Sequence, residues 1–193
     1  DPTTGKTADS AKAYNDAKTA AQEAIKEAET VINDENATPE QVTAALEKVN
    51  AKKAALQQAK DGLIEAATAE EKAKLKADAA QLTKADETGK TPNSIAAYEA
   101  AYEKLKTQLE EAKAAAAAVE AKGNNASKTE AQEAQAKVDA AKTALDKAAE
   151  SLVNKADKAE LKTAKEALNT LATAEDPTTG KTADSAKAYN DAK

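Results

Sequence analysis

The sequence predicts an all-α fold of tandem, elongated three-helix bundles with left-handed, heptad-like antiparallel packing. Three observations predict it: a composition rich in alanine, lysine, glutamate and leucine with few glycines and prolines, helix-capping motifs, and apolar residues at heptad spacing. The common residue types are strong helix formers, and apolar residues seven positions apart line one face of a helix. We expect nearly continuous helices to join the bundles into a rod.

Capping motifs give the helix starts. A serine or threonine followed three residues later by glutamate or glutamine forms a capping box, as at Thr38, Thr68 and Ser127. Thr91 precedes a proline suited to a first helical turn. Loops are expected at 34–37, 85–90, 122–126 and 175–181. The expected helices are 8–33, 39–66, 69–84, 92–121, 128–153, 155–172 and 183 onward.

Apolar residues at heptad spacing form the seams along which we expect the helices to pack. Alanines between them allow close approach but bury little area, since each methylene contributes only about 0.8 kcal/mol. The larger seam residues should therefore matter most for stability. They are Val42, Val49, Leu56, Leu63, Ile95, Leu105, Leu109, Val138, Leu145, Leu152, Leu161 and Leu168.

The chain contains repeats on two scales. Residues 1–18 and 176–193 are identical, which indicates one period of 175 residues and the start of another copy. We therefore expect the chain to be part of a longer tandem array. A diverged repeat of about 86 residues lies inside the period, where residues 5–14 align with residues 89–98. The later helices align at offsets of 86 and 89.

The junction after the second long pair of helices favours continuity. No glycine or proline occurs between Gly123 and Pro177, so helix 128–153 is expected to continue into 155–172. Leu152 and Leu161 are nine residues apart, which is about half a rotation beyond two whole turns of a helix. One helix would then close one bundle and open the next. A break is favoured at the earlier junction, which carries Gly62.

The run from residue 5 to residue 63 resembles the FIVAR module of Gram-positive surface proteins. In that family a T-x-x-S helix start precedes a long helix, and an N-A-T-x-E-x-V turn leads into a helix that ends A-x-x-x-L. The matching residues are Thr7, Ser10, Asn36, Ala37, Thr38, Glu40, Val42, Ala59 and Leu63. The second unit carries Thr91, Ser94, Asn125, Ala126, Ser127 and Leu152, and departs from the pattern after Ser127.

The resemblance implies a three-helix bundle in which a shorter helix precedes two long ones. Residues 1–67 would be the second and third helices of a module whose first helix is missing. Residues 68–153 would be a complete module, and residues 154–193 the first helix and the start of the second helix of the next. Incomplete ends would favour head-to-tail association. The resemblance also implies an exported, cell-wall-attached protein, often an adhesin with a stalk.

No residue pattern predicts catalysis, and we expect neither a cofactor nor a metal. The GKT triplets resemble part of a P-loop, but Lys84 and Glu175 stand where that motif needs glycine. The chain has no histidine or cysteine, so most nucleophilic and general acid–base routes are missing. The net charge of −6 with mixed signs disfavours nucleic acid, and no apolar run is long enough for membrane insertion.

The leading functional hypothesis is a stalk that projects a distal adhesive domain from the cell wall. Each period would add roughly 80–100 Å, from helices of about 25 residues. The alternative is a repeat that itself binds a host extracellular protein, such as fibronectin or albumin, with avidity from repetition. Partners would be neighbouring copies or such a host protein. Binding needs an exposed apolar patch, and packing is the favoured role of Tyr14, Tyr98 and Tyr102.

Overall fold

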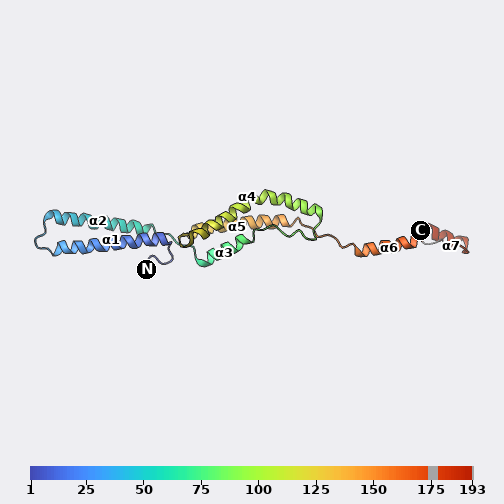
Figure 1. Cartoon of the computed structure of the whole chain (residues 1–193), viewed down its shortest axis with the longest axis horizontal. Coiled ribbons are helices and arrows are strands. Elements are labelled where there is room, and N and C mark those ends of the chain that lie inside the picture. The colour runs from blue at the N-terminus through green and yellow to red at the C-terminus, as the bar shows by residue number, and fades with distance from the viewer. Residues whose placement is uncertain (174–177, 193) are drawn as a thin grey trace.

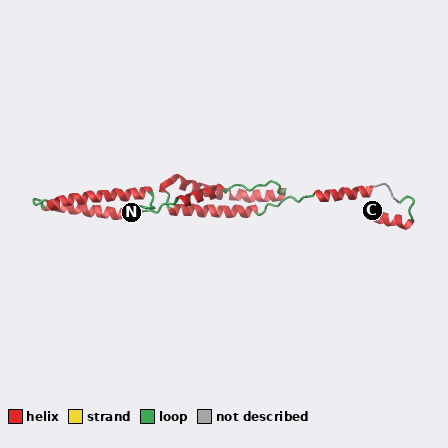
Figure 2. Cartoon of the chain, turned by 90° about the horizontal axis from the view of Figure 1, so that it is seen from below, coloured by secondary structure: helices red, strands yellow, loops and turns green. Residues whose placement is uncertain are grey.

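The computed structural model describes residues 1–173 and 178–192, and the predicted all-α class is confirmed. The chain forms a two-helix hairpin, a three-helix bundle and two further helices, in that order along one line (Figure 1). A view turned by 90° shows the same line, so the described part is rod-like (Figure 2). The elements are α1 (Ala8–Asn33), α2 (Pro39–Asp61), α3 (Ala69–Ala80), α4 (Pro92–Lys122), η1 (Gly123–Asn125), α5 (Lys128–Ala149), α6 (Ala159–Thr173) and α7 (Ala183–Ala192).

The predicted caps start the helices. At α2, Thr38 Oγ1 accepts from the Gln41 backbone N–H at 3.3 Å, and Gln41 Oε1 accepts from the Thr38 N–H at 2.7 Å. Reciprocal boxes of the same kind start α3 at Thr68 and α5 at Ser127. Each box satisfies two backbone N–H groups that the helix itself leaves unpaired. The expected loop at 175–181 lies partly outside the described residues, as does part of the duplicated segment 176–193.

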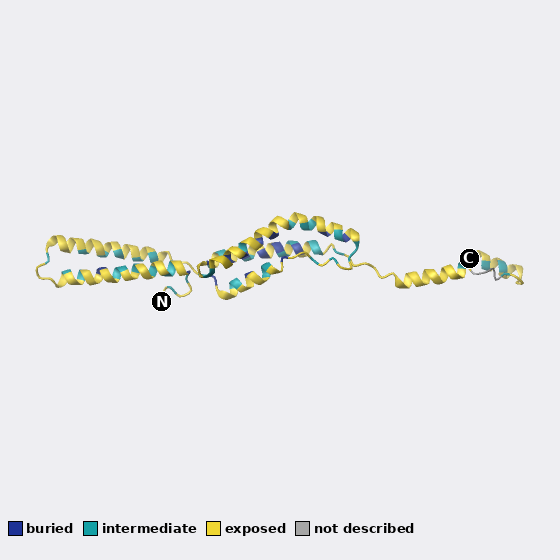
Figure 3. Cartoon of the chain, in the orientation of Figure 1, coloured by how far each residue is buried: buried dark blue, intermediate teal, exposed yellow. Residues whose placement is uncertain are grey.

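A continuous core exists in the α3–α5 bundle (Figure 3). Both long helices of the bundle turn alanines and a few larger residues toward α3, which closes the third side. Since most core members are alanine, the bundle is slender. The buried cluster comprises Ala67, Leu75, Leu82, Leu109, Ala112, Ala116, Val119, Ala126, Ala131, Ala134, Val138, Ala141 and Leu145.

The predicted continuous helix across the second junction is wrong. α5 ends at Ala149 and α6 begins at Ala159, with non-helical chain between them. The reason is a long-range backbone pairing, in which the Thr91 N–H donates to the Val153 carbonyl and the Lys155 N–H to the Gly89 carbonyl, each at 2.8 Å. Residues paired in this way cannot also make the i to i−4 hydrogen bonds of a helix.

Long-range backbone pairing at the junction between α2 and α3 also ends α2 early. This helix ends at Asp61 rather than at the expected residue 66, because the following residues pair with the start of the chain. α3 is also shorter than expected and ends at Ala80 instead of residue 84. Within the described residues, no helix has both the length and the apolar character needed to cross a membrane.

Candidate interaction surfaces

The first GKT triplet closes the α1–α2 hairpin at its base. The Thr7 N–H donates to the Ile64 carbonyl at 2.8 Å, and the Ala66 N–H donates to the Gly5 carbonyl at 2.9 Å. Gly5 has a φ of +70°, a conformation that glycine adopts without the Cβ penalty of other residues. We call this pairing of residues 5–7 with 64–66 the first clasp.

The second GKT triplet makes an equivalent closure at the base of α4 and α5. Gly89, with a φ of +73°, and Thr91 pair with Val153 and Lys155 as described above. The Lys90 ammonium also donates to Asn154 Oδ1 at 2.7 Å. We call this pairing of residues 89–91 with 153–155 the second clasp. The GKT triplets are therefore junction elements at the entry to a long helix.

The family's T-x-x-S residues brace these clasps. Ser10 Oγ accepts from the Ile64 N–H at 3.2 Å and donates to the Thr7 carbonyl at 3.1 Å. In the second unit, Ser94 Oγ donates to the Thr91 carbonyl at 2.9 Å. Thr7 and Ser94 are buried. The motif thus ties the first turn of α1 to the chain that follows α2, and the first turn of α4 to the chain that follows α5.

The first clasp also holds the neighbouring bundle. The Ala67 N–H donates to the Ala126 carbonyl and the Lys128 N–H donates to the Glu65 carbonyl, each at 2.9 Å. Asn125 Oδ1, from the α4–α5 turn, accepts from the Asp9 N–H at the start of α1 at 2.8 Å. Backbone from the hairpin, from the connecting chain and from the bundle therefore meets at one joint.

Tyr98 packs inside the bundle rather than presenting its ring as a binding anchor. Its side chain is fully buried, and its hydroxyl oxygen accepts from the Ala85 N–H at 2.6 Å. The ring lies 6.0 Å from that of Tyr102, centroid to centroid, in a tilted arrangement. Tyr14, its equivalent in the hairpin, is only half-buried.

The predicted seam residues fall into three groups in the structure. Those buried in the bundle are Leu109, Val138 and Leu145. Those half-buried are Val49, Leu56, Leu63, Ile95, Leu105 and Leu152. Those exposed are Val42 on α2, and Leu161 and Leu168 on α6.

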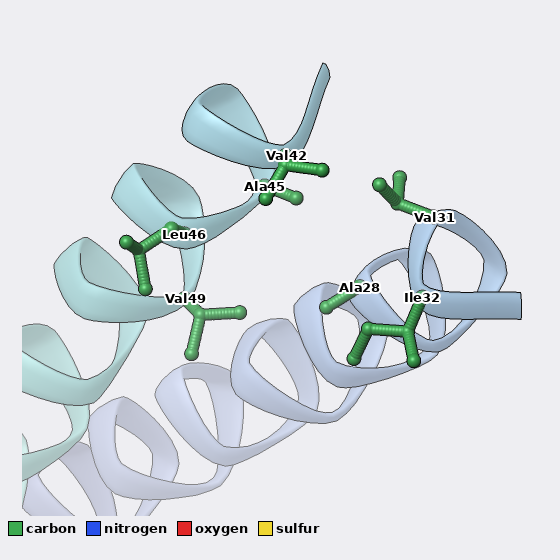
Figure 4. A pocket seen from close by; sticks show the side chains of 7 residues that line it. All are labelled: Ala28, Val31, Ile32, Val42, Ala45, Leu46 and Val49. Atoms are coloured by element: carbon green, nitrogen blue, oxygen red, sulfur yellow. The ribbon is translucent and has the colours of Figure 1, made fainter. Parts of the chain in front are cut away.

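An apolar hollow of about 300 Å³ lies near the turn of the α1–α2 hairpin (Figure 4). The side chains in Figure 4 converge from both helices, and every one is alanine, valine, leucine or isoleucine. Ile32 is 78% exposed and Leu46 is 59% exposed. We call this surface the hairpin face, and its residues are Ala28, Val31, Ile32, Val42, Ala45, Leu46 and Val49.

The bundle covers the equivalent surface. By the repeat offsets of 84 and 89, five hairpin-face residues correspond to buried residues of α4 and α5. Those five pairs are Ala28 with Ala112, Ile32 with Ala116, Val42 with Ala131, Ala45 with Ala134, and Val49 with Val138. α3 packs over this surface in the bundle, and no described helix does so in the hairpin.

Charged groups lie outside these apolar faces and form local pairs. The pKa of Glu130 is lowered to about 2 by the Lys122 ammonium and then by the Ser127 N–H of the capping box. The pKa of Lys84 is raised by Glu87 and then by Glu99. Such exposed pairs contribute little to stability. Across residues 1–173 and 178–192, no group of three acidic side chains is placed to hold a metal ion.

Helical units repeated along the chain, with the base of the hairpin joined to the α4–α5 turn of the bundle, define a tandem helical-repeat protein. The family model for the FIVAR domain matches residues 1–57 and 59–146, and the chain belongs to this family. The resemblance inferred from the sequence is therefore confirmed.

Known relatives are much longer than this chain. It is 35% identical over 190 residues to extracellular matrix-binding protein EbhB of Staphylococcus aureus strain N315, which is 97% of this chain and 5% of that protein. The chain is also 35% identical over 190 residues to extracellular matrix-binding protein ebh of Staphylococcus aureus strain JH9, which is 97% of this chain and 2% of that protein. No solved structure shows significant similarity to the chain.

Proposed function

We propose that the chain is a non-enzymatic spacer of a bacterial surface protein, which holds a distal adhesive domain away from the cell wall. The unit boundaries proposed for it are 1–67, 68–153 and 154–193, and its neighbours in the rod are copies of the same repeat. Family membership and relatives that are named extracellular matrix-binding proteins support an extracellular, wall-attached location.

The single observation that carries this proposal is the joint at the first clasp. Three backbone segments from two units are hydrogen-bonded there, through Thr7, Ala66, Ala67 and Lys128 as donors. Bending the hairpin against the bundle would break several of these bonds at once. A joint of this kind keeps successive units in line, which is what a spacer requires.

Scattering measurements on arrays test the spacer. Small-angle X-ray scattering on proteins of two and four periods should give maximum dimensions that grow by roughly 80–100 Å per period. Replacing Ala67 by proline removes the N–H that bonds Ala126 of the bundle, and should shorten the particle by bending the joint, whereas Ala67→Ser keeps that N–H. A compact particle for the unmodified array would contradict the proposal.

A second candidate function is binding of a host protein by each repeat. The observation that favours it is the hairpin face, an exposed apolar surface of the kind that binding needs. The relatives' printed names point the same way. Surface-immobilised fibronectin that retains the unmodified chain but not an Ile32→Glu, Leu46→Glu variant would support this candidate, and equal retention would contradict it.

A further inference from the structure

We propose that Asn125 is an inter-unit helix cap, through which the bundle completes the N-terminus of α1 and couples the folding of the hairpin to its own. The inference deepens the proposed spacer and rests on it only in treating the hairpin and the bundle as successive units. It gives a function to the asparagine of the family's turn motif, which the spacer alone leaves unexplained.

The N-cap residue of α1 leaves the helix uncapped. Thr7 occupies this position, but its side chain makes no capping hydrogen bond, and its hydroxyl donates to Ser10 Oγ at 2.9 Å. In α4, by contrast, Thr91 Oγ1 accepts from the Ser94 N–H at 3.4 Å. The first four N–H groups of a helix have no partner inside the helix. The first turn of α1 therefore needs an acceptor from elsewhere.

Asn125 supplies an acceptor from the neighbouring unit. The α4–α5 turn lies against the base of the hairpin (Figure 1), and Asn125 Oδ1 accepts from the Asp9 N–H at 2.8 Å. Asp9 is the second residue of α1, and an N-cap side chain bonds the N–H of the second or third helical residue. Asparagine is also among the residue types preferred at N-caps. Asn125 thus does for α1 what an N-cap does, from 116 positions along the chain.

An identical helix start in α7 caps itself. Residues 183–192 repeat residues 8–17, and each run follows a Gly-Lys-Thr triplet. In α7 the Ser185 N–H donates to Thr182 Oγ1 at 3.4 Å, and among the described residues no turn of another unit bonds this helix start. Because the two sequences are the same, the local sequence cannot cause the difference. The difference follows from the α4–α5 turn, which lies against α1.

The other residues of the α4–α5 turn hold Asn125 in place. Ala126 is 1% exposed, and its carbonyl accepts a backbone N–H from the chain that precedes α3. Ser127 caps α5 with its own hydroxyl. The Gly123 carbonyl, at the start of the turn, accepts from the Lys72 ammonium of α3 at 3.0 Å. The turn is therefore fixed on both sides of Asn125, so the cap forms without further ordering of the backbone.

The cap makes the stability of the hairpin depend on the bundle. The hairpin has little core of its own, since Ala24 is the buried residue of α1 and α2 has none. Its helix ends therefore matter more than those of the bundle. Removing an N-cap changes the folding equilibrium constant of a helix by about fivefold, and unfolding of the α4–α5 turn would remove that factor from α1. Coupling of this kind makes neighbouring repeats unfold together.

Amide hydrogen exchange of the full chain, followed by NMR, tests the cap. Asn125→Ala should speed the exchange of the Asp9 amide by about fivefold and leave the equivalent Asp184 amide unchanged. Asn125→Asp keeps an acceptor oxygen and should retain the slow exchange. Asn124→Ala, at the adjacent exposed residue, is the matched control and should change neither rate. An unchanged Asp9 rate in Asn125→Ala would overturn the inference.

Urea unfolding followed unit by unit tests the coupling. Isoleucine occurs at Ile25 and Ile32 in the hairpin and at Ile95 in the bundle, so labelled methyl groups report the two units separately. Asn125→Ala should lower the urea midpoint of the hairpin more than that of the bundle, and Asn124→Ala should lower neither. A hairpin midpoint that stays unchanged, or falls no more than that of the bundle, would contradict the coupling. The backbone bonds of the joint remain in either case, so the growth in length of arrays tests the spacer separately.

Discussion

The α1–α2 hairpin and the α3–α5 bundle share two long antiparallel helices and differ by one helix of 12 residues. With that helix the bundle buries Leu109, Ala116 and Val138, whereas in the hairpin Ala24 is the buried apolar residue of α1 and α2 has none. The long helices are therefore held in shape mainly by caps and helix propensity. The short helix converts their alanine-rich faces into a core.

The strongest test of this comparison is to remove one leucine from each of two equivalent positions, Leu82 just after α3 and Leu168 on α6. Leu82→Ala should lower the free energy of unfolding by roughly 3 kcal/mol, because it leaves a cavity at a fully buried site. The equivalent Leu168→Ala should change it by less than about 0.5 kcal/mol in dilute solution, since the side chain is exposed. Urea titration followed by circular dichroism measures both. Equal losses would contradict the difference between the two short helices.

A second pair compares the long helices. Leu145 is buried in α5, and its equivalent Leu56 is half-buried in α2. Leu145→Ala should lower the free energy of unfolding by roughly 2–4 kcal/mol. Leu56→Ala should lower it by only about 1 kcal/mol, because Leu56 is already partly exposed and its truncation leaves less of an enclosed cavity. Thermal melts of the two variants at one protein concentration distinguish these values. A larger loss for Leu56→Ala would mean that the hairpin has a core of its own.

The clasps offer a smaller effect that should be alike in both units. Gly5 and Gly89 have φ near +70°, and nothing lies within 4 Å of a Cβ added at either. Alanine at each position should therefore cost about 1 kcal/mol through backbone strain alone. Chemical denaturation of Gly5→Ala and Gly89→Ala measures this, with Gly5→Asn and Gly89→Asn as milder matched variants. Unequal losses at the two sites would show that the clasps are not equivalent.

The smallest expected effect distinguishes the capping box of α5 from the capping box of α2. The pKa of Glu130 is lowered from 4.5 to about 2, so its contribution to stability is present above pH 4.5 and is lost as the pH falls toward 2. Gln41 fills the same place in α2 without a charge. The melting temperature should fall less between pH 5 and pH 2 for Glu130→Gln than for the unmodified chain. Identical pH profiles would show that the charge of Glu130 contributes nothing.

Local signals were sufficient for the helices and their caps. Thr38, Thr68 and Ser127 each carry a complete capping box within four residues, and the structure reproduces all three. The second junction was mispredicted because Val153 and Lys155 bond to residues more than 60 positions earlier. No local propensity records such pairing. One signal was available, since GKT occurs in both units at the same distance before a long helix.

Heptad spacing in the sequence could not predict which seam leucines are buried, for a similar reason. Leu82 and Leu168 occupy equivalent heptad positions, and periodicity treats them alike. Their exposures differ because Leu82 lies against α4 and α5, whereas no described pair of long helices lies against Leu168. The hairpin face escaped prediction in the same way, since Ile32 and Leu46 look like ordinary seam residues in the sequence.

The clasps also decide how the rod responds when it is pulled. Tension applied along the chain enters at residues 5–7 and crosses directly to 64–66 through backbone hydrogen bonds, so the hairpin between them bears no load. The second clasp shields α4 and α5 in the same way. Each pair of long helices is then a folded segment that adds length only after its clasp opens. Opening the first clasp would release roughly 190 Å of extended chain. Single-molecule stretching would record each release as a separate step.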